Sequence, residues 1–315
     1  MKAVVLDGYT LNPGDLDWKD LQAHLELVVY DRTQPHEVIS RISDASIVFT
    51  NKTVIDKEVI ESCDNVKYIG VLATGYNVVD IEECQKRGII VTNVPTYSTQ
   101  AVAQHVLALL LEVTNQVGLH NQLVKQKVWS QGPDFTFWSS PLIELYGKTA
   151  GIIGYGKIGQ AVTKVFESLG MDVIVYNRSQ IKDDYPQVSL EYLLQNSDVI
   201  SLHVPLTKQT HQIINEDRLK LMKKEAILIN TSRGPLIDEE VLVEALSNQW
   251  IYAAALDVTT QEPIQSDHPL LALDNCFITP HIAWAPTETR RRLLGQVVDN
   301  VVSYLNGQPI NVVTK

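Results

Sequence analysis

The sequence predicts an α/β protein with two parallel-sheet units in tandem. Short continuous runs of Val, Ile and Leu alternate with stretches of helical spacing, a pattern typical of parallel strands buried on both faces. The alternation stops in a loop rich in Gly, Pro, Ser and aromatic residues, from Trp129 to Pro141, and then starts again. At 315 residues the chain is too long for one ordinary domain and has about the length of two.

The first half of the chain predicts a sheet flanked by helices. Apolar runs predict strands over residues 3–6, 27–30, 47–50, 68–72 and 89–92. Helical spacing marks residues 16–25, 35–42 and 80–87. A long helix then follows Ser98, which can cap it, and it is too apolar all round for a plain surface helix. We therefore expect the long helix to pack between domains or against a second subunit.

The second half of the chain repeats the alternation. Helices are predicted over residues 159–169 and 190–194. Strands are predicted over residues 150–153, 173–176, 199–203, 227–230, 253–256 and 277–279. Polar residues follow several of these strands, and open parallel sheets bind their ligands at that end.

Composition and charge exclude several classes of protein. The chain has 26 Lys and Arg against 37 Asp and Glu, a net charge of −11 without a basic stripe, so we expect no nucleic-acid partner. No apolar run approaches the roughly 18 residues of a membrane span. Asp7 comes too early for a signal peptide. Three scattered cysteines suggest neither disulfides nor a metal site, so we expect a cytoplasmic protein without a metal.

A glycine-rich loop predicts a dinucleotide site. The segment Gly154-Tyr155-Gly156-Lys157-Ile158-Gly159 follows an apolar strand and opens an amphipathic helix, the context that a GxGxxG motif requires. Gly154 permits the tight turn, Gly156 lets the backbone approach a pyrophosphate, and Gly159 lets helix and strand pack closely. The helix N-terminus then faces the negative charge.

The end of the next strand favours NADP(H). An acidic residue there would bind the ribose hydroxyls of NAD, but the sequence has Asn177-Arg178-Ser179. Arg178 can pair with a 2′-phosphate. The alternative is a solvated surface arginine, with NAD(H) held by other contacts.

Three segments that follow strands carry residues suited to carbonyl reduction. His281 can protonate the alkoxide that forms when a ketone accepts a hydride. Glu262 can bind the other imidazole nitrogen and orient the ring. Arg233 can hold a carboxylate through two hydrogen bonds and polarise the adjacent carbonyl. Asp257 can accept a hydrogen bond from a nicotinamide carboxamide.

These segments make the chain resemble the D-isomer-specific 2-hydroxyacid dehydrogenase family. The resemblance extends over nearly the whole chain, and the stretches that carry it are residues 71–80, 154–159, 202–207, 230–234, 257–263 and 280–283. Arg233, Glu262 and His281 occur in the order of the family's Arg, Glu and His. Two departures are Thr259, where a larger apolar residue is usual, and Gln104, where glutamate is more familiar.

The resemblance implies two doubly wound parallel-sheet domains of the Rossmann-like or flavodoxin-like kind, with the active site in the cleft between them. Residues 1–97 and 285–315 would form the substrate domain, and residues 98–284 the dinucleotide domain. Backbone N–H groups of Thr74 and Gly75 would bind the substrate carboxylate together with Arg233. The long helix after Ser98 and the loop beyond it would serve a homodimer.

The resemblance also implies a set of cofactor contacts. These are Gly154, Gly156, Lys157, Ile158, Gly159, Asn177, Arg178, Ser179, His203, Val204, Pro205, Thr210, Thr231, Ser232, Asp257 and Ala283.

Within the family, the chain looks most like glycerate dehydrogenases, also called hydroxypyruvate or glyoxylate reductases. Residues 73–77, 135–138 and 281–286 carry this likeness. Related enzymes place a tryptophan of a neighbouring subunit over the substrate, and Trp138 is the candidate; the alternative is a packed interface tryptophan.

We therefore expect reduction of glyoxylate or hydroxypyruvate with NADPH or NADH. A D-lactate-type or broader 2-oxo acid reductase is the alternative within this class. A dinucleotide-sensing co-regulator is the alternative outside it, and such a protein would not need the complete set of Arg233, Glu262 and His281.

Overall fold

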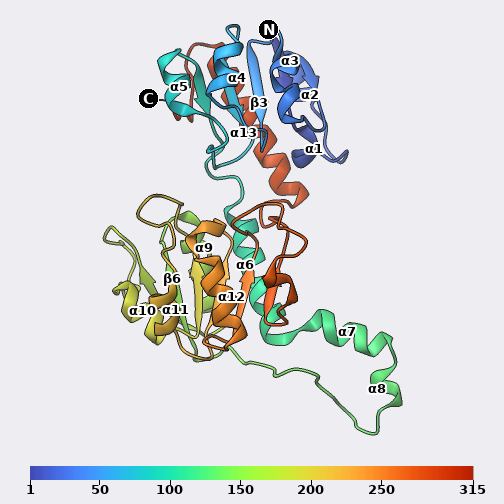
Figure 1. The fold of residues 1–315 in the computed structure, drawn as a ribbon, viewed down its shortest axis with the longest axis vertical. Coiled ribbons are helices and arrows are strands. Elements are labelled where there is room, and N and C mark those ends of the chain that lie inside the picture. Colours follow the sequence, from blue (N-terminus) through green and yellow to red (C-terminus); the bar gives the residue numbers. More distant parts are fainter. Residues whose placement is uncertain (315) are drawn as a thin grey trace. The chain divides into compact units, whose positions relative to one another are not determined.

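The chain folds into two compact units, each with its own parallel sheet (Figure 1). The computed structural model describes residues 1–314. The split unit comprises residues 1–98 and the segment from Trp284 onward, and the central unit comprises residues 99–283. Lys315, which ends the predicted range 285–315, lies outside the described residues. The predicted fold class of two parallel-sheet α/β domains is confirmed.

The split unit contains a five-stranded parallel sheet in the order β2-β1-β3-β4-β5. Its strands are β1 (Lys2–Val5), β2 (Glu26–Val29), β3 (Ile47–Thr50), β4 (Tyr68–Val71) and β5 (Ile90–Thr92). Its helices are α1 (Gly8–Leu11), α2 (Lys19–Gln22), the 3₁₀ helix η1 (Pro35–Glu37), α3 (Val38–Ile42), α4 (Lys57–Ser62), α5 (Ile81–Lys86) and α13 (Thr287–Leu305).

Helices cover both faces of this sheet. Apolar side chains of α3, α4 and α5 pack with Val4, Val48 and Ile69 on one face. Residues of α1, α2 and α13 pack with Val5 and Phe49 on the other. Side chains of successive strand residues point to opposite faces, which is why strands covered on both sides need continuous apolar runs.

Four helices of the split unit differ from the sequence prediction, which contains neither α1 nor α4. The helix predicted over residues 16–25 is confined to α2, because the side chain of Asn12 accepts hydrogen bonds from the N–H groups of Gly14 and Leu16 and holds the preceding chain in a turn. The C-terminal helix α13 was not predicted as a helix. Its buried residues Leu293, Val297 and Val301 recur at helical spacing and complete the second face of the sheet.

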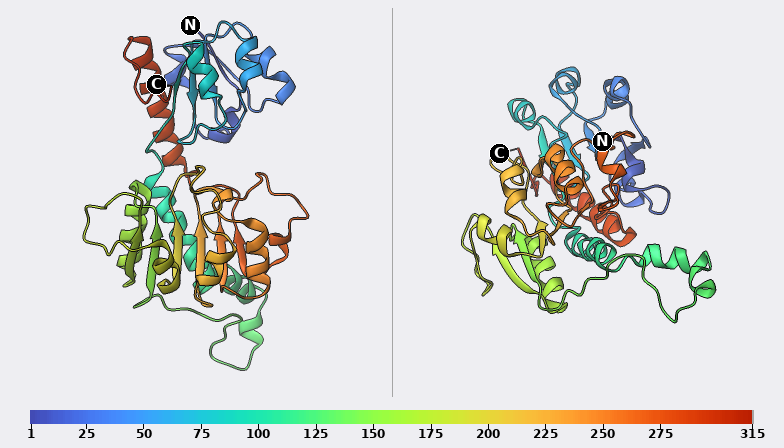
Figure 2. Two further views of the ribbon diagram at one scale, coloured as in Figure 1. Left: turned by 60° about the vertical axis from the view of Figure 1, so that its left-hand side comes forward. Right: turned by 60° about the horizontal axis from the view of Figure 1, so that its bottom comes forward.

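The central unit contains a six-stranded parallel sheet in the order β11-β10-β9-β8-β6-β7 (Figure 2). Its strands are β6 (Thr149–Ile153), β7 (Asp172–Tyr176), β8 (Val199–Leu202), β9 (Ile227–Asn230), β10 (Ala253–Leu256) and β11 (Cys276–Ile278). Its helices are α6 (Thr99–Asn115), α7 (Val117–Lys125), α8 (Val128–Gln131), α9 (Lys157–Ser168), α10 (Leu190–Asn196), α11 (Glu216–Leu221), α12 (Glu239–Ser247) and the 3₁₀ helices η2 (Gly234–Leu236) and η3 (Pro269–Ala272).

The long helix α6 buries its apolar residues within the central unit. Val106, Leu110 and Val113 are fully buried in one core with residues of α9 and of the sheet. Helices α10, α11 and α12 contribute to a second core, which includes Leu228 and Leu256. Packing inside its own unit therefore accounts for the buried face of α6, while Gln104 and Ala108 on its other side are exposed.

The strand orders show where the chain reverses the direction in which it adds strands to each sheet. In the central unit the chain runs from β6 to the edge strand β7 and then crosses back to β8, on the other side of β6. Ligands of open parallel sheets bind outside the carboxyl ends of the strands at such a switch point. The loop that starts at Gly154 follows β6, and His203 follows β8, so these residues border the switch point.

In the split unit the equivalent position, between β1 and β3, is filled by a side chain of the protein. The buried carboxylate of Asp7 follows β1 and accepts hydrogen bonds from the backbone N–H groups of Asn51, Lys52 and Thr53, at 2.8, 2.6 and 2.8 Å. An internal anion therefore occupies the donors that a bound phosphate would need.

Helices α7 and α8 and the loop that follows them form an arm of the central unit. Neither helix has a buried residue, although Val117, Trp129 and Trp138 are large and exposed. In residues 1–314 no helix is long and apolar enough to cross a membrane. The same residues contain no group of three or more His, Cys, Asp or Glu side chains that could hold a metal ion.

Candidate active site

The glycine loop after β6 has the shape that its sequence predicts. Gly154 has φ +98°, and a Cβ there would lie 2.6 Å from the carbonyl oxygen of His203. A Cβ at Gly159 would clash with the carbonyl oxygen of Gly154, so the loop folds back onto the first turn of α9. A Cβ at Gly156 would meet nothing within 4 Å. No side chain caps α9 at Gly156, so its first N–H groups remain available to an anion.

Two buried polar atoms next to this loop have no partner among the described residues. They are Nδ1 of His203 and Oγ1 of Thr231, which follow the neighbouring strands β8 and β9. Burial lowers the pKa of His203 to about 3, so its imidazole is neutral, and Ser201 holds Nε2 at 2.8 Å. Buried polar atoms without a partner are rare, and they suit a bound group with its own polar atoms. A dinucleotide fits these features: the uncapped N–H groups of α9, the open space at Gly156, and the two atoms without a partner.

The segment after β7 is held by the side chain of Asn177. Its Oδ1 accepts the N–H of Tyr155 at 3.1 Å, and its Nδ2 donates to the carbonyl oxygen and the hydroxyl of Ser179 at 2.9 and 3.0 Å. Arg178, between them, has no hydrogen bond or ion pair with any described residue. A cavity of about 300 Å³ lies here, lined by Asn177, Ser179 and Lys182 among others. One cationic side chain, Lys182, and one carboxylate, Asp183, therefore line this space, and Arg178 lies in the chain between two other lining residues.

Hydrogen bonds of Asn230 and Ser232 hold the turn that carries Arg233. The buried side chain of Asn230 accepts the N–H of Ser232 at 3.0 Å and donates to the carbonyl oxygen of Arg233 at 2.8 Å. The hydroxyl of Ser232 donates to the carbonyl oxygen of Leu202 on the adjacent strand at 2.7 Å. Within residues 1–314 the guanidinium of Arg233 donates one bond, to the carbonyl oxygen of Ser232 at 2.6 Å, and its other N–H groups are available to a ligand.

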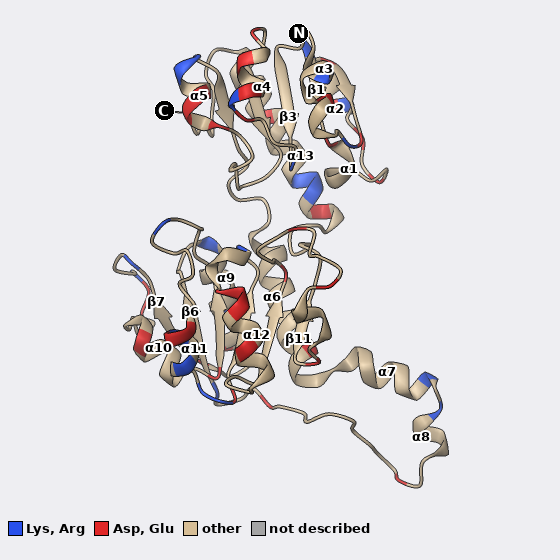
Figure 3. Cartoon of the chain, viewed as in Figure 1, with Lys and Arg blue, Asp and Glu red and all other residues tan. Residues whose placement is uncertain are grey.

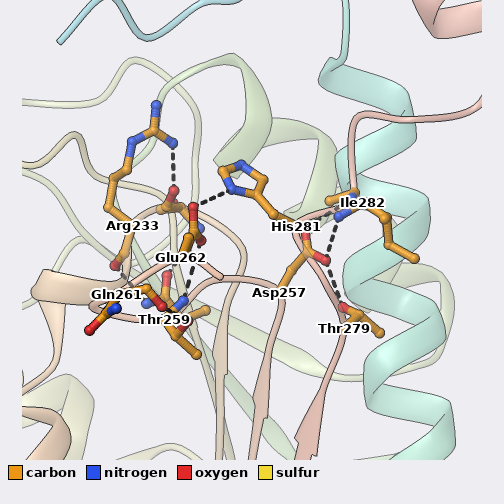
Figure 4. Close-up of polar contacts among 11 residues, drawn as sticks. Arg233, Asp257, Thr259, Gln261, Glu262, Thr279, His281 and Ile282 are labelled. Carbon is orange, nitrogen blue, oxygen red and sulfur yellow. Dashed lines mark hydrogen bonds and ion pairs between the residues drawn. The ribbon is translucent and has the colours of Figure 1, made fainter. Parts of the chain in front are cut away.

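Glu262 and His281 form a hydrogen-bonded pair (Figure 4). Nδ1 of His281 lies 2.8 Å from Oε2 of Glu262. The other carboxylate oxygen of Glu262 accepts the N–H of Thr259 at 3.4 Å. The His281 side chain is 22% exposed, and Nε2 is the nitrogen that remains for a substrate. His281 also has φ +55°, a conformation that β-branched and bulky residues rarely adopt.

Asp257 anchors the segment that carries His281. Oδ1 accepts the hydroxyl of Thr279 at 2.6 Å and the N–H of Ile282 at 2.8 Å, and Oδ2 accepts the N–H of Ala283 at 2.8 Å (Figure 4). Burial alone would raise the pKa of Asp257, but the hydrogen bonds from its neighbours, His105 among them, outweigh burial and hold that pKa below its usual value. Residues on both sides of His281 are thus tied to one ionised carboxylate.

His105 of α6 supports this anchor, and no sequence pattern indicated this role. Its Nε2 lies 3.3 Å from Oδ1 of Asp257 and 3.0 Å from the hydroxyl of Thr279. A histidine in an otherwise apolar helix was the available signal. Its partners, however, lie more than 150 positions further along the chain, and spacing along the sequence does not predict them.

The remaining predicted residues lie in several places. Within the central unit, Val204 would meet a Cβ of Gly154 at 2.7 Å, and the hydroxyl of Thr210 donates to the carbonyl oxygen of Pro205 at 2.6 Å. Trp138 belongs to the arm and is 64% exposed. Thr74 and Gly75 belong to the split unit, where the hydroxyl of Thr74 donates to the carbonyl oxygen of Val94 at 2.8 Å.

Comparison with known proteins identifies the family. Residues 107–283 match the model of the D-isomer specific 2-hydroxyacid dehydrogenase, NAD binding domain. The chain is 53% identical to a hydroxypyruvate reductase of Blautia hydrogenotrophica over 100% of both chains, and 37% identical to a glycerate dehydrogenase of Methylorubrum extorquens over 99% of this chain and 98% of that one.

A solved structure agrees in fold over the same extent. An acyclic imino acid reductase in complex with NADPH and D-Arg superposes with a TM-score of 0.87 at 34% identity, over 99% of this chain and 100% of that one. The resemblance inferred from the sequence is thereby confirmed. The chain belongs to the D-isomer-specific 2-hydroxyacid dehydrogenases, a family of oxidoreductases that bind a nicotinamide dinucleotide.

Proposed function

We propose that the protein reduces hydroxypyruvate or glyoxylate to D-glycerate or glycolate, with NADPH preferred over NADH. The observation that carries the proposal is the Glu262–His281 pair, in one unit with the Arg233 turn and the glycine loop. The relatives named hydroxypyruvate reductase and glycerate dehydrogenase support the substrate class.

Each site residue has a proposed role in this reaction. The reduced nicotinamide supplies the hydride when it is bound. Arg233 binds the substrate carboxylate, together with backbone N–H groups of Thr74 and Gly75. His281 donates the proton on Nε2 to the carbonyl oxygen as the alkoxide develops. Glu262 holds Nδ1, so the ring keeps its orientation and the imidazolium is stabilised. The balance is one 2-oxo acid, one reduced nicotinamide and one proton consumed for each 2-hydroxy acid formed.

The dinucleotide contacts remain part of this proposal. The glycine loop and α9 would hold the pyrophosphate, and the residues after β8 and β9 would contact the rest of the cofactor. For Asp257 we favour anchoring of the His281 segment over a carboxamide contact, because protein donors already use both of its oxygens.

The residues after β7 support NADPH. Arg178 has no competing partner among residues 1–314, and no carboxylate stands at Asn177 to repel a phosphate. Asn177 is itself engaged with Tyr155 and Ser179, so it shapes the turn on which Arg178 is presented.

The proposal also includes a homodimer formed through α6 and the arm, in a cytoplasmic protein. The arm helices bury no residue of their own, and α7 carries one charged side chain, Lys125 (Figure 3). Trp138 of one subunit would then cover the substrate of the other. The three unpaired cysteines support a reducing compartment.

The experiment that tests the function is a crossed assay of the purified protein. Loss of reduced-nicotinamide absorbance is followed with NADPH or NADH against glyoxylate, hydroxypyruvate and pyruvate, and the chirality of the glycerate product is determined. Fast turnover of the first two acids with NADPH is the expected result. A preference for NADH would contradict the role of Arg178, and a preference for pyruvate would favour a D-lactate-type reductase. Tight cofactor binding without turnover of any acid would contradict the proposal and favour a dinucleotide sensor.

A further inference from the structure

The loop that carries Glu262 is held at both ends by one side chain. The loop runs from Thr259 to His268, between β10 and η3, and Glu239 lies outside it at the start of α12. Oε2 of Glu239 accepts the N–H of Thr260 at 2.6 Å, and Oε1 lies 3.2 Å from Nε2 of His268. The Glu239 side chain is only 12% exposed. One carboxylate thus joins the beginning and the end of the loop.

The ring of His268 is oriented to donate to Glu239. Its Nδ1 accepts the N–H of Leu270 at 3.3 Å, at the start of η3. An imidazole nitrogen that accepts a hydrogen bond carries no proton, so in the neutral ring the proton is on Nε2, which faces Glu239. Both oxygens of Glu239 therefore have a donor on the loop.

Backbone hydrogen bonds hold the segment from which Glu239 reaches the loop. The segment between Arg233 and α12 is bound to the preceding chain through three backbone hydrogen bonds, from Gln212 to Pro235 at 2.8 Å, from Ile214 to Leu236 at 3.0 Å, and from Asp238 to Ile214 at 2.8 Å.

The same segment also meets the loop directly. A Cβ at Gly234 would clash with the backbone of Thr259 and Thr260, so the two segments are in close contact at this position. The segment that presents Arg233 thus also holds the loop that presents Glu262.

We propose that Glu239 is a positioning residue for Glu262, with His268 as its support. Glu239 holds the loop that carries Glu262 in place relative to the turn that carries Arg233. The inference rests on the proposed role of Glu262. Displacement of a reacting group by about 1 Å can cost roughly 100-fold in rate, so a loosened loop lowers turnover even though Glu239 touches neither substrate nor cofactor. The nicotinamide dinucleotide is bound by other residues, so its affinity is not expected to change.

The test compares four variants in the NADPH-dependent assay. Glu239→Ala removes both contacts and is expected to lower kcat by about tenfold or more, with the KM for NADPH unchanged. Glu240→Ala is the matched control, because Glu240 is the exposed next residue of the same helix turn, and it is expected to match the wild type. Glu239→Gln keeps an oxygen for the N–H of Thr260 and is expected to restore part of the loss.

His268→Asn, the fourth variant, is the milder probe if Glu239→Ala does not fold. Asparagine can still accept the N–H of Leu270 but is too short to replace the ring at Glu239. It is expected to lower kcat without changing the KM for NADPH. A kcat equal to that of Glu240→Ala in both Glu239→Ala and His268→Asn would overturn the inference, as would a parallel rise in the KM for NADPH.

Glu262→Gln is measured alongside, to separate this inference from the proposed function. Loss of turnover in Glu262→Gln with full turnover in Glu239→Ala overturns the positioning role alone. Full turnover in Glu262→Gln overturns the role of Glu262 and the positioning role with it.

Discussion

His281 is the residue on which the proposed chemistry depends most directly. Replacement by asparagine removes the proton donor, and asparagine tolerates the positive φ of this position better than most residues. We expect kcat for reduction to fall by roughly 100-fold or more, while the dissociation constant of NADPH, measured by fluorescence titration, stays the same. His24→Ala, an exposed histidine of the split unit, is the control. Retained turnover in His281→Asn would show that another group supplies the proton.

At this scale the sequence predicts the reacting groups better than their supports. Arg233, Glu262 and His281 could be selected because each follows a strand and has suitable chemistry. The contacts of Asp257 with His105, and of Glu239 with the Glu262 loop, join elements far apart in the chain. No local pattern specifies such contacts, since they arise only when α6 and α12 pack on the sheet.

The turn from β6 into α9 makes a prediction about two glycines of one motif. Gly159→Ala places a methyl group against the carbonyl oxygen of Gly154, whereas Gly156→Ala places it in open space. We therefore expect Gly159→Ala to lower the melting temperature and the affinity for NADPH together. Gly156→Ala is expected to keep the melting temperature and to lose affinity only, because its methyl group stands where a pyrophosphate would approach. Equal thermal effects in the two variants would contradict this assignment of roles.

The start of α13 makes a prediction about pH. The guanidinium of Arg290 donates to both oxygens of Asp15, at 2.7 and 2.6 Å, and lowers the pKa of Asp15 to about 2. A carboxyl whose pKa is lower in the folded state stabilises the fold above its unfolded pKa, near 4, and loses this effect as pH falls. The melting temperature of Asp15→Asn should therefore lie below that of the wild type at pH 7, and the difference should disappear between about pH 4 and pH 2.

Asp20→Asn is the control for this prediction, since Asp20 is exposed and Arg290 forms its ion pair with Asp15. Its melting temperature should follow that of the wild type throughout. A difference between Asp15→Asn and the wild type that stays constant down to pH 2 would mean that charge is not the cause.

Strands could be predicted more closely than helices. Each strand of the two sheets lies within a residue or two of its predicted run, because burial on both faces requires continuous apolar residues. The helix predicted over residues 16–25 failed because Asn12 stabilises a competing turn, a local preference that hydrophobic spacing does not reveal. Helix α13 carried a signal that was not used: Leu293, Val297 and Val301 recur at helical spacing, and Gly307, with φ +74°, follows its end.

At the scale of the whole molecule, the two sheets have similar topology but carry different groups at the switch point. In the central unit the first strand is followed by glycines and by N–H groups that no side chain caps. After β8 and β9, Nδ1 of His203 and Oγ1 of Thr231 have no partner among the described residues. In the split unit it is followed by Asp7, whose carboxylate uses three backbone N–H groups. This difference supports the assignment of dinucleotide binding to the central unit, because topology alone would allow either unit to bind.

The proposed homodimer gives a prediction for the whole molecule. An arm that buries none of its large apolar side chains within its own chain gains stability by burying them against a second copy. Sedimentation should therefore give twice the chain mass of 35.3 kDa. Val117→Asp introduces a charge at a 66% exposed position of α7 and should yield a folded monomer. The melting profile of the central unit should stay the same. If Trp138 acts across the interface, the KM for the 2-oxo acid should rise. A wild-type protein that sediments at 35.3 kDa would refute the dimer and leave Trp138 without a role at the substrate.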